Sequence, residues 1–414
     1  MKPNQQRLPV TTRVLYISYT GLLDPLGQSQ VLQYVLGLAR EHRMTLLTFE
    51  KPAALKDAQR VAELAAQCRA AGVDWHHLRY HNKPNLPATL YDLACGIRKG
   101  VQLARQTGAE VVHCRSYIAG LMGLAVKRAT GARYIFDMRG FWPDERVDGG
   151  IWKKTSLQYR AFKAVERRLF LSASHVVSLT RAGVREFRQF DYLQAQQPPV
   201  TVIPTCTNLD LFALPAPSTT AKKGFTLGYV GSVGSWYMFD DVARAVRLLM
   251  DTRPDARFLV INKGGHETIR QHLVAAGVDL ARVEIKAVPY DQVGQEVGRM
   301  DAGIFFYKAV WSKRASCPTR MGEFLACGKP CLANAGVGDV EEDLQQTGTG
   351  VAIHEFSDAT LRAALERLLQ LTTEEGIEAR CRKAAEERFS LPVGVNAYSA
   401  IYTRLGQASR EPRA

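Results

Sequence analysis

The residues best suited to chemistry lie in one segment of the second half, Ser312–Asn334, which reads SKRASCPTRMGEFLACGKPCLAN. Arg320 and Glu323 are three residues apart, so a helix would place both on one side, opposite an apolar face. The N-terminus of such a helix, together with Lys313 and Arg314, concentrates positive potential that suits a diphosphate. The carboxylate could then accept both hydroxyls of a ribose. An exposed Arg320–Glu323 ion pair without any ligand explains the spacing equally well.

A glycine-containing turn earlier in the second half adds a further phosphate-binding candidate. The apolar run FTLGYV ends in GSVGSWYMFDD at 231–241. The spacing predicts a turn at Gly231, Ser232 and Gly234 where a ligand can come close to the backbone. The N–H groups of this turn would be free to bind phosphates. Lys263, which follows RFLVIN, adds a candidate cation. A plain strand-to-helix turn explains any single glycine almost equally well.

In the first half, a charged loop follows the apolar run YIFDM at 134–138. Loops at strand ends hold functional side chains disproportionately often, and an indole ring can stack on a sugar. The alternative is a salt-bridged loop anchored by a buried Phe141 or Trp142. The candidate side chains of this loop are Asp137, Arg139, Trp142, Asp144 and Glu145.

Two other strand ends in the first half have polar residues. The loop TGLLDPLGQSQ (20–30) places Gly27 and Gln28 just before a helix, where they can contact a sugar or a phosphate. His113 and Arg115 end the run VVHCR, and a lone histidine there is more often packed than functional. The sequence has no D-x-D pair and no His/Cys cluster with ligand spacing, so no metal site is predicted.

Short β-branched runs alternate with amphipathic stretches along the chain, which predicts parallel sheets covered by helices on both faces. The pattern restarts near Phe225, after a polar, Pro-containing linker at 211–224. Two doubly wound α/β domains are therefore expected, with ligands at the carboxyl ends of their strands. A helix is predicted over 29–43, and a helical tail over 373–405 is broken at Leu391–Pro392. The predicted strands are 14–19, 44–49, 73–80, 111–114, 134–138, 175–180, 200–205, 225–231, 257–262, 283–288, 302–307, 331–334 and 351–355.

The composition agrees with two folded domains. The 414 residues exceed one ordinary core, and 46% hydrophobic with 23% charged residues excludes a disordered or collagen-like chain. No apolar stretch is long enough to span a membrane, and the first residues lack the apolar core of a secretory signal. The eight cysteines form no C-x-x-C pair and indicate reduced thiols in a cytosolic protein.

The net charge of +14 lies entirely in the first half. Residues 1–200 hold 29 Lys+Arg and 15 Asp+Glu, whereas residues 201–414 hold 25 of each. This asymmetry suggests an anionic partner such as nucleic acid, an acidic membrane leaflet or a phosphorylated substrate. A solvated basic surface with no partner is the alternative.

Four separated motifs resemble the family-4 glycosyltransferases of the GT-B fold. They are VLYISYTGLLDPLGQSQ (14–30), FDMRGFWPDERVDGGIW (136–152), VIPTCTNLDLF (202–212) and EFLACGKP (323–330), in the order of that family. The resemblance implies two Rossmann-like domains, a donor sugar nucleotide held by the second, transfer with retention, no metal and no cofactor. It also implies that the final helices cross back to the first domain. The expected domains are thus 1–205, with 390–414 packed on it, and 206–389.

The resemblance assigns roles to positions of this chain and also shows departures. Glu323 matches the second glutamate of the family's E-x7-E motif, which binds ribose, but Ala315 stands where the first is expected. Arg139 and Gly140 stand where many members have a His-Asp pair. The assigned catalytic residues are Arg139, Asp144 and Glu145. The assigned donor-binding residues are Gly231, Ser232, Gly234, Lys263, Lys313, Arg314, Arg320 and Glu323, and the acceptor or sugar residues are Gly27, Gln28, Asp137 and Trp142.

The function expected from the resemblance is transfer of a hexose from a UDP- or GDP-sugar to a glycan or lipid-linked acceptor, in cell-surface polysaccharide synthesis. A cytoplasmic location is expected, with docking on the inner face of an anionic membrane as an option. Two alternatives remain: a sugar-nucleotide epimerase of the same fold, which Ala315 weakens, and a non-catalytic binder of anionic polymers. The second alternative lacks any nucleic-acid-binding motif, so no nucleic-acid partner is expected.

Overall fold

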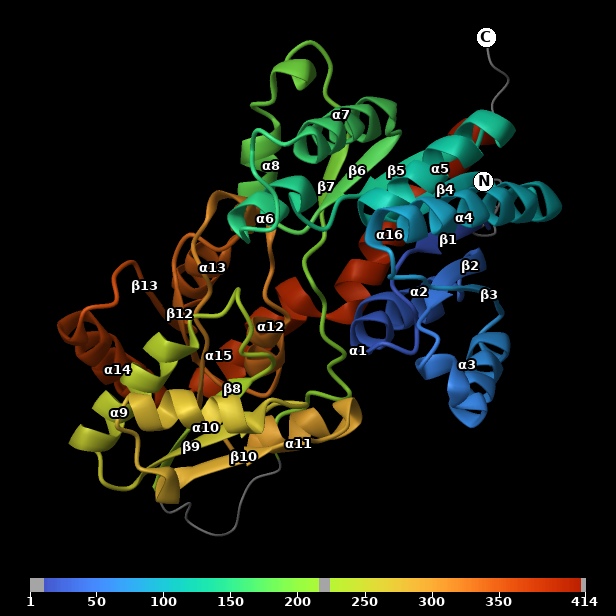
Figure 1. The fold of residues 1–414 in the computed structure, drawn as a ribbon. Helices are drawn as coiled ribbons and strands as arrows, with labels where there is room; N and C mark the ends of the chain where they lie inside the picture. The colour runs from blue at the N-terminus through green and yellow to red at the C-terminus, as the bar shows by residue number, and fades with distance from the viewer. Residues whose placement is uncertain (1–10, 216–223, 411–414) are drawn as a thin grey trace, which may run out of the picture.

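The computed structural model describes residues 11–215 and 224–410, which form two parallel sheets with helices on both faces (Figure 1). The first sheet has the strand order β3-β2-β1-β4-β5-β6-β7. Its strands are β1 (Arg13–Ser18), β2 (Arg43–Glu50), β3 (Val73–Arg79), β4 (Val111–Arg115), β5 (Arg133–Asp137), β6 (His175–Ser178) and β7 (Val200–Val202).

The second sheet has the order β10-β9-β8-β11-β12-β13, again with parallel neighbours. Its strands are β8 (Phe225–Val230), β9 (Ala256–Ile261), β10 (Val283–Lys286), β11 (Ala302–Ile304), β12 (Cys331–Asn334) and β13 (Gly350–Ile353). All thirteen predicted strands are confirmed, and so is the two-domain GT-B architecture. The ends differ most at β7 and β11, which are three residues shorter than predicted.

The helices connect consecutive strands, as parallel pairing requires. Those of the first half are α1 (Pro25–Gly27), α2 (Gln33–Leu38), α3 (Ala58–Ala70), α4 (Asn85–Thr107), α5 (Ser116–Thr130), α6 (Trp142–Asp148), α7 (Leu157–Ser172) and α8 (Arg181–Phe187). Those of the second half are α9 (Phe239–Thr252), α10 (His266–Ala275), α11 (Val293–Gly298), α12 (Thr319–Ala326), α13 (Val340–Thr347), α14 (Asp358–Thr373), α15 (Ile377–Ala384) and α16 (Leu391–Arg410).

Short helical segments complete the list, and two are π-helical. They are η1 (Gln28–Leu32), η2 (Ala54–Lys56), η3 (Asp191–Leu193), η4 (Leu280–Arg282), η5 (Tyr290–Gln292), η6 (Trp311–Ala315) and η7 (Ala385–Phe389). The first helical region runs from Pro25 through η1 to Leu38, so the prediction of 29–43 began and ended too late. The predicted break in the tail is present but lies one residue earlier than predicted, because Ser390 is extended and Leu391–Pro392 begin α16.

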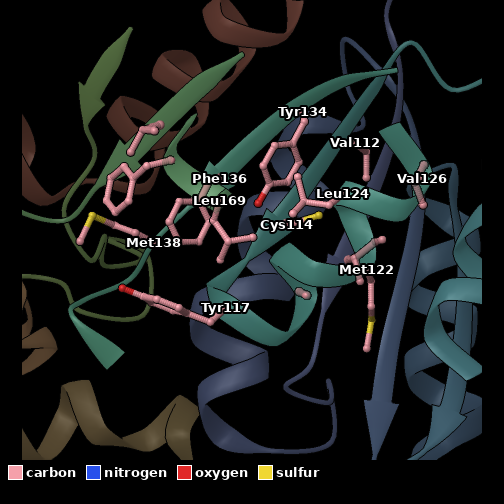
Figure 2. Close-up of a cluster of buried hydrophobic side chains, with 14 of the residues drawn as sticks. Val112, Cys114, Tyr117, Met122, Leu124, Val126, Tyr134, Phe136, Met138 and Leu169 are labelled. Carbon is pink, nitrogen blue, oxygen red and sulfur yellow. The ribbon is translucent and has the colours of Figure 1, made fainter. Parts of the chain in front are cut away.

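The core of the first domain lies between its sheet and helices α4, α5 and α7. Val112, Tyr134 and Phe136 from the strands meet Met122 and Leu169 from the helices, and all are buried (Figure 2). The second domain buries corresponding side chains on both faces of its sheet. Burial on both faces explains why the strands are continuous apolar runs rather than alternating ones.

The chain crosses between the domains twice, and the two crossings touch. Thr207 pairs with Ser390 in an isolated parallel bridge, and the Leu391 N–H donates to the Thr207 carbonyl at 3.0 Å. After the second crossing, α16 packs on α2 of the first domain, which confirms the expected return of the final helix. The domain boundaries at 205/206 and 389/390 stay predictions. Residues 216–223 of the predicted linker lie outside the described residues.

No helix in the described ranges is both long enough and apolar enough to cross a membrane.

Candidate active site

The second-domain part of the site lies where β8 and β11 are neighbours at the centre of the sheet. The connections from these two strands leave in opposite directions, because β8 pairs with β9 on one side and β11 with β12 on the other. Ligands of open α/β sheets bind at such a point, outside the carboxyl ends of the strands. The turn after β8 and helix α12 both lie here, as the sequence predicted.

Arg320 of α12 lies among three tyrosine rings at this point. Its guanidinium carbon is 4.8 Å from the ring centre of Tyr229, 4.6 Å from that of Tyr237 and 5.3 Å from that of Tyr307. The side chain is only 5% exposed, and its Nη1 has no hydrogen-bond partner within the described residues. A buried cation with an unused donor is costly unless an anion completes it. Arg320 is therefore suited to hold a phosphate.

Glu323 lies one turn further along α12 and is 8% exposed. Burial raises the pKa of its carboxyl to about 7, although nearby Arg320 opposes the shift. Among residues 11–215 and 224–410, no group donates a hydrogen bond to this carboxyl or forms an ion pair with it. The alternative of an exposed Arg320–Glu323 ion pair is therefore wrong, since both residues are buried and more than 4.0 Å apart.

The turn after β8 brings its backbone against Arg320. Gly231 has φ +108°, and a Cβ built on it would lie 2.5 Å from Arg320 Nη2, so only glycine fits there. Asn262 fixes the turn by donating to the Gly231 carbonyl at 2.7 Å. In the described part of the chain, the N–H groups of Ser232 and Gly234 donate no hydrogen bond. They are thus available to an anion, whereas the Gly231 N–H is bonded to the Ile261 carbonyl.

The remaining predicted donor-site cations have different surroundings. Lys313 lies over the Trp236 ring at 4.0 Å and donates to Glu145 of the first domain at 2.9 Å. Arg314 forms an ion pair with Glu186 of the first domain. Lys263 is exposed, beyond the end of β9. The structure thus brings Arg320, rather than all four cations, to the turn after β8.

The loop after β5 joins the two domains. Phe141 is fully buried and stacks on Trp311 of η6 with ring centres 4.5 Å apart. Trp142 packs between Trp152 and Phe162 within the first domain, so its ring is covered by other rings. The alternative of an aromatic anchor in this loop is confirmed for Phe141.

The sequence predicted a loop here, but Asp144 and Glu145 lie in the first turn of helix α6, and both have partners. Asp144 accepts from Tyr159 at 2.7 Å and from Lys163 at 3.0 Å, whereas Glu145 accepts from Lys313 across the domain contact. Both carboxylates are thus held by side chains of the protein, and their predicted catalytic role stays a prediction. Gly27 also has a structural role, because a Cβ on it would lie 1.8 Å from the Gly21 carbonyl oxygen. The Gln28 side chain is half-buried and forms no hydrogen bond within the described residues.

Asp137 and Arg139 lie at the end of β5, beneath α16. Tyr398 of α16 donates to Asp137 Oδ2 at 2.9 Å, and Arg139 Nη1 lies 3.9 Å from Asp137 Oδ1. Burial raises the pKa of Asp137, but Arg139 and His113 outweigh it and hold that pKa below its usual value. The carboxylate is therefore ionised. The sequence did not predict Tyr398 as part of this site, because no feature of the sequence around Tyr398 indicates a contact with β5.

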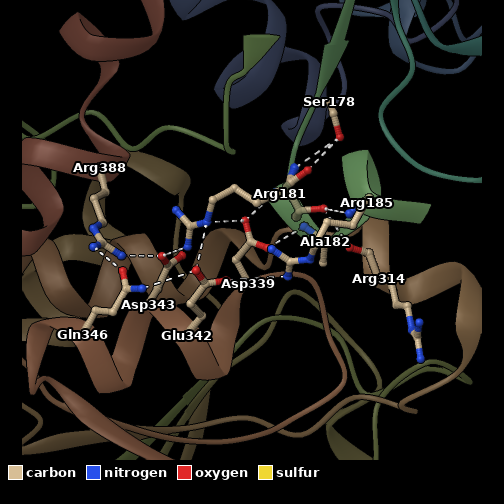
Figure 3. A network of polar contacts seen from close by, with 12 residues as sticks. Ser178, Arg181, Ala182, Arg185, Arg314, Asp339, Glu342, Asp343, Gln346 and Arg388 are labelled. Atoms are coloured by element: carbon tan, nitrogen blue, oxygen red, sulfur yellow. Dashed lines mark hydrogen bonds and ion pairs between the residues drawn. The ribbon is translucent and has the colours of Figure 1, made fainter. Parts of the chain in front are cut away.

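A second contact between the domains links α8 to α13 (Figure 3). Asp339, before α13, accepts the Arg181 N–H at 2.6 Å and the Ala182 N–H at 2.8 Å, both at the start of α8. The Arg181 side chain donates to Asp343 at 2.6 Å. An acceptor at a helix N-terminus satisfies otherwise free donors, so this contact fixes α8 against α13.

Ala315 explains why the first glutamate of the family motif is missing. Its side chain is fully buried, and a Cβ built on Gly183 of α8 would lie 2.9 Å from the Ala315 Cβ. A longer side chain at position 315 would push the domains apart. This position packs the domain contact here instead of binding a ligand.

The comparisons with known proteins agree with this geometry. The family model described as "Glycosyl transferase 4-like domain" matches residues 27–206, and "Glycosyl transferases group 1" matches residues 213–388. A search of curated proteins found no match.

Solved structures show the same fold at low sequence identity. Sucrose-phosphate synthase from Thermosynechococcus elongatus has a TM-score of 0.70 and 15% identity, over 96% of this chain and 100% of that one. HepE of Anabaena, in complex with UDP and glucose, has a TM-score of 0.68 and 14% identity, over 95% and 100%. WaaG, a glycosyltransferase involved in lipopolysaccharide biosynthesis, has a TM-score of 0.65 and 16% identity, over 94% and 99%.

The two family models follow one another along the chain, and the two sheets, the returning α16 and the strand-end site match the architecture they describe. The chain belongs to the family-4 glycosyltransferases, metal-independent enzymes of the GT-B fold that transfer a hexose from a nucleotide sugar with retention.

Proposed function

We propose that this enzyme transfers a hexose from a UDP-sugar bound at α12 and the turn after β8. The observation that supports it is a pair of buried groups one turn apart, the Arg320 guanidinium, whose Nη1 has no hydrogen-bond partner in the described residues, and the Glu323 carboxyl. A cation and a carboxyl at this distance fit the diphosphate and the ribose of one nucleotide. The complexes of HepE with UDP and with UDP-glucose support the choice of UDP.

Departure of the diphosphate is the electrostatic problem of the reaction. Negative charge develops on the leaving phosphate as the bond to the anomeric carbon breaks, and preformed donors stabilise it best where water is excluded. Arg320 and the free N–H groups of Ser232 and Gly234 supply such donors, and Lys263 is a further candidate from the edge of the site. The transfer proceeds with retention, and the described residues of α12 and of the turn after β8 include no second carboxylate besides Glu323. We therefore propose that the leaving phosphate accepts the proton of the acceptor hydroxyl.

The acceptor binds on the first-domain side, at the ends of β4 and β5. Asp137, the last residue of β5, and Arg139, in the segment after it, are the groups that lie at the strand ends. Asp144 and Glu145 act through the lysines that they hold. Glu145 in particular fixes Lys313, and through it the loop that contains Trp236.

We further propose a glycan or lipid-linked acceptor of cell-surface polysaccharide synthesis, used at the cytoplasmic face of a membrane. The positive charge of the first half suits an anionic leaflet. Helix α4 also exposes three large apolar side chains, those of Leu86, Leu90 and Tyr91, near its N-terminus. Pelleting with phosphatidylglycerol vesicles should decrease steeply between low and high salt. Pelleting that is absent, or that salt does not change, would contradict the membrane part of the proposal.

Calorimetric titration with UDP tests the donor site. Glu323→Ala removes the acceptor of the ribose hydroxyls, and we expect UDP to bind about tenfold or more weakly, since hydrogen bonds to charged groups contribute about 1.5–3 kcal/mol. Glu366→Ala, an exposed glutamate on α14, is the matched control and should bind UDP as the wild type does. Titration with GDP in parallel identifies the base. Equal UDP affinity of Glu323→Ala and wild type would refute this donor site.

A further inference from the structure

Unsatisfied polar atoms gather at the adjacent ends of β4 and β5 in the first sheet. Ten buried side-chain atoms of the described residues have no hydrogen-bond partner, and three of them are here. They are His113 Nε2, Arg115 Nε and Asp137 Oδ1, and His113 Nε2 lies 3.5 Å from the other carboxylate oxygen of Asp137 without forming a hydrogen bond to it. Residues on these strands are direct neighbours, since Arg115 pairs with Asp137 in the sheet. Packing alone would satisfy such atoms or replace them.

The backbone is strained at the same two strand ends. Ser116 has φ +72° and Arg139 has φ +58°, and no other non-glycine residue in the described ranges has a positive φ. Such conformations are unfavourable for non-glycine residues, persist only where the surrounding structure enforces them, and cluster at functional sites. One of the two follows Arg115 directly, and the other is Arg139 itself. The strain therefore coincides with the placement of two guanidinium groups.

The charges at this point do not balance. Arg115 is 7% exposed and forms no hydrogen bond or ion pair with its side chain in the described residues, and the Arg139 side chain is 9% exposed. Among the residues that the structure describes, Asp137 is the one carboxylate that acts on both guanidinium groups. Burial lowers the pKa of His113, which therefore stays neutral, and burial raises the pKa of the nearby Tyr16 and Tyr398 hydroxyls.

An excess positive charge is thus buried at the strand ends. Two guanidinium groups face one carboxylate, with neutral rings around them. Burying an uncompensated charge costs several kcal/mol, so the arrangement is expected where an anion completes it. Arginine is also the side chain that binds a phosphate group by two parallel hydrogen bonds.

We propose that Arg115 and Arg139 bind a phosphate group of the acceptor. The donor diphosphate has its own groups on the second domain, namely Arg320 and the turn after β8. The first-domain pair is therefore left for the second substrate. That the bound molecule is an acceptor rests on the proposed function, whereas the phosphate site itself does not. The basic first half of the chain is consistent with a phosphorylated acceptor.

Titration with inorganic phosphate at constant ionic strength tests the site, first without UDP and then with saturating UDP. We expect the wild type to bind phosphate under both conditions. Arg115→Gln should bind it about tenfold more weakly, and Arg115→Lys, which keeps the charge, should lose less. Arg128→Gln is the matched control, because Arg128 is an exposed arginine of the helix that follows β4. It should bind phosphate as the wild type does.

Thermal unfolding without phosphate shows whether the variants fold. Arg115→Gln removes the repulsion from Arg139, so its Tm should equal or exceed that of the wild type, and phosphate should raise it less. A lower Tm without phosphate would indicate that Arg115 is structural and would overturn the proposal.

The binding outcomes separate this proposal from the proposed function. Equal phosphate affinity of Arg115→Gln and Arg128→Gln would overturn the site. Loss of phosphate binding on addition of UDP would also overturn it, because the pair would then belong to the donor site. Failure of UDP to bind would refute the donor assignment and leave the phosphate titration without UDP interpretable.

Discussion

The raised pKa of Glu323 makes a sharp prediction about how stability depends on pH. The carboxyl ionises near 4.5 in the unfolded chain and near 7 in the folded protein, because it is buried. Between these values the folded protein keeps a proton that the unfolded chain releases, so the free energy of unfolding falls as pH rises. The loss saturates above pH 7 at about 3 kcal/mol. Glu323→Gln cannot ionise and should escape this loss.

Urea unfolding of the second domain at pH 5 and at pH 8 measures the effect. Relative to wild type, Glu323→Gln should gain about 2.5 kcal/mol between the two pH values, whatever its stability at pH 5, because part of the loss has already occurred at pH 5. Glu366→Gln, changed at an exposed site, should follow the wild type at both. Parallel pH profiles of wild type and Glu323→Gln would refute the buried-carboxyl interpretation.

The same titration should appear in ligand binding. If the ribose hydroxyls donate hydrogen bonds to the Glu323 carboxylate, UDP binds the protein in which Glu323 is ionised. Below pH 7, binding of UDP must therefore release the proton that Glu323 holds. The affinity of the wild type for UDP should then rise about tenfold per pH unit below this pKa and level off above it. In Glu323→Gln, UDP binding should be weaker, and its pH dependence should keep only the part that comes from ionisation of the terminal phosphate of UDP, whose second pKa is about 6.

Other perturbations separate local strain, domain contact and metal use. Gly231→Ala should lower the free energy of unfolding by about 1–3 kcal/mol and weaken UDP binding, because the new Cβ meets Arg320 at a residue with positive φ. Gly234 has open space around it, so Gly234→Ala is the control. It should change neither the free energy of unfolding nor the affinity for UDP. Ala315→Glu restores the family's acid but buries a charge against Gly183, so it should lower stability by about 3 kcal/mol or more; increased transfer activity would show this explanation to be mistaken. Treatment with EDTA should leave nucleoside diphosphate release unchanged, and a loss that magnesium restores would contradict metal independence.

The fold was predictable because each buried strand is a continuous apolar run and each helix has one apolar face. Residues placed by a strand end, such as Asp137 at the end of β5 and Gly231 after β8, could be located in the same way. Periodicity alone was enough for these positions, since a parallel sheet brings all its strand ends to one edge.

The partners of the cations were not predictable, because they come from the other domain. Lys313 and Arg314 read locally as phosphate ligands, but Glu145 and Glu186 hold them in the domain contact. The sequence predicts Arg115 only as the last residue of a core strand. Its proposed role in phosphate binding is suggested only by the structure, in which the adjacent strand β5 leads to the second guanidinium, that of Arg139.

The return of α16 to the first domain has a consequence for the order in which the protein can be completed on the ribosome. Asp137 and His113 are made 261 and 289 residues before their hydroxyl partners, Tyr398 and Tyr402. Until α16 has been synthesised, the first domain therefore has two polar groups without these partners and an uncovered apolar groove where α16 packs. A truncated chain that stops before residue 390 should bind a hydrophobic dye at that groove, and addition of the missing helix as a peptide should reverse it.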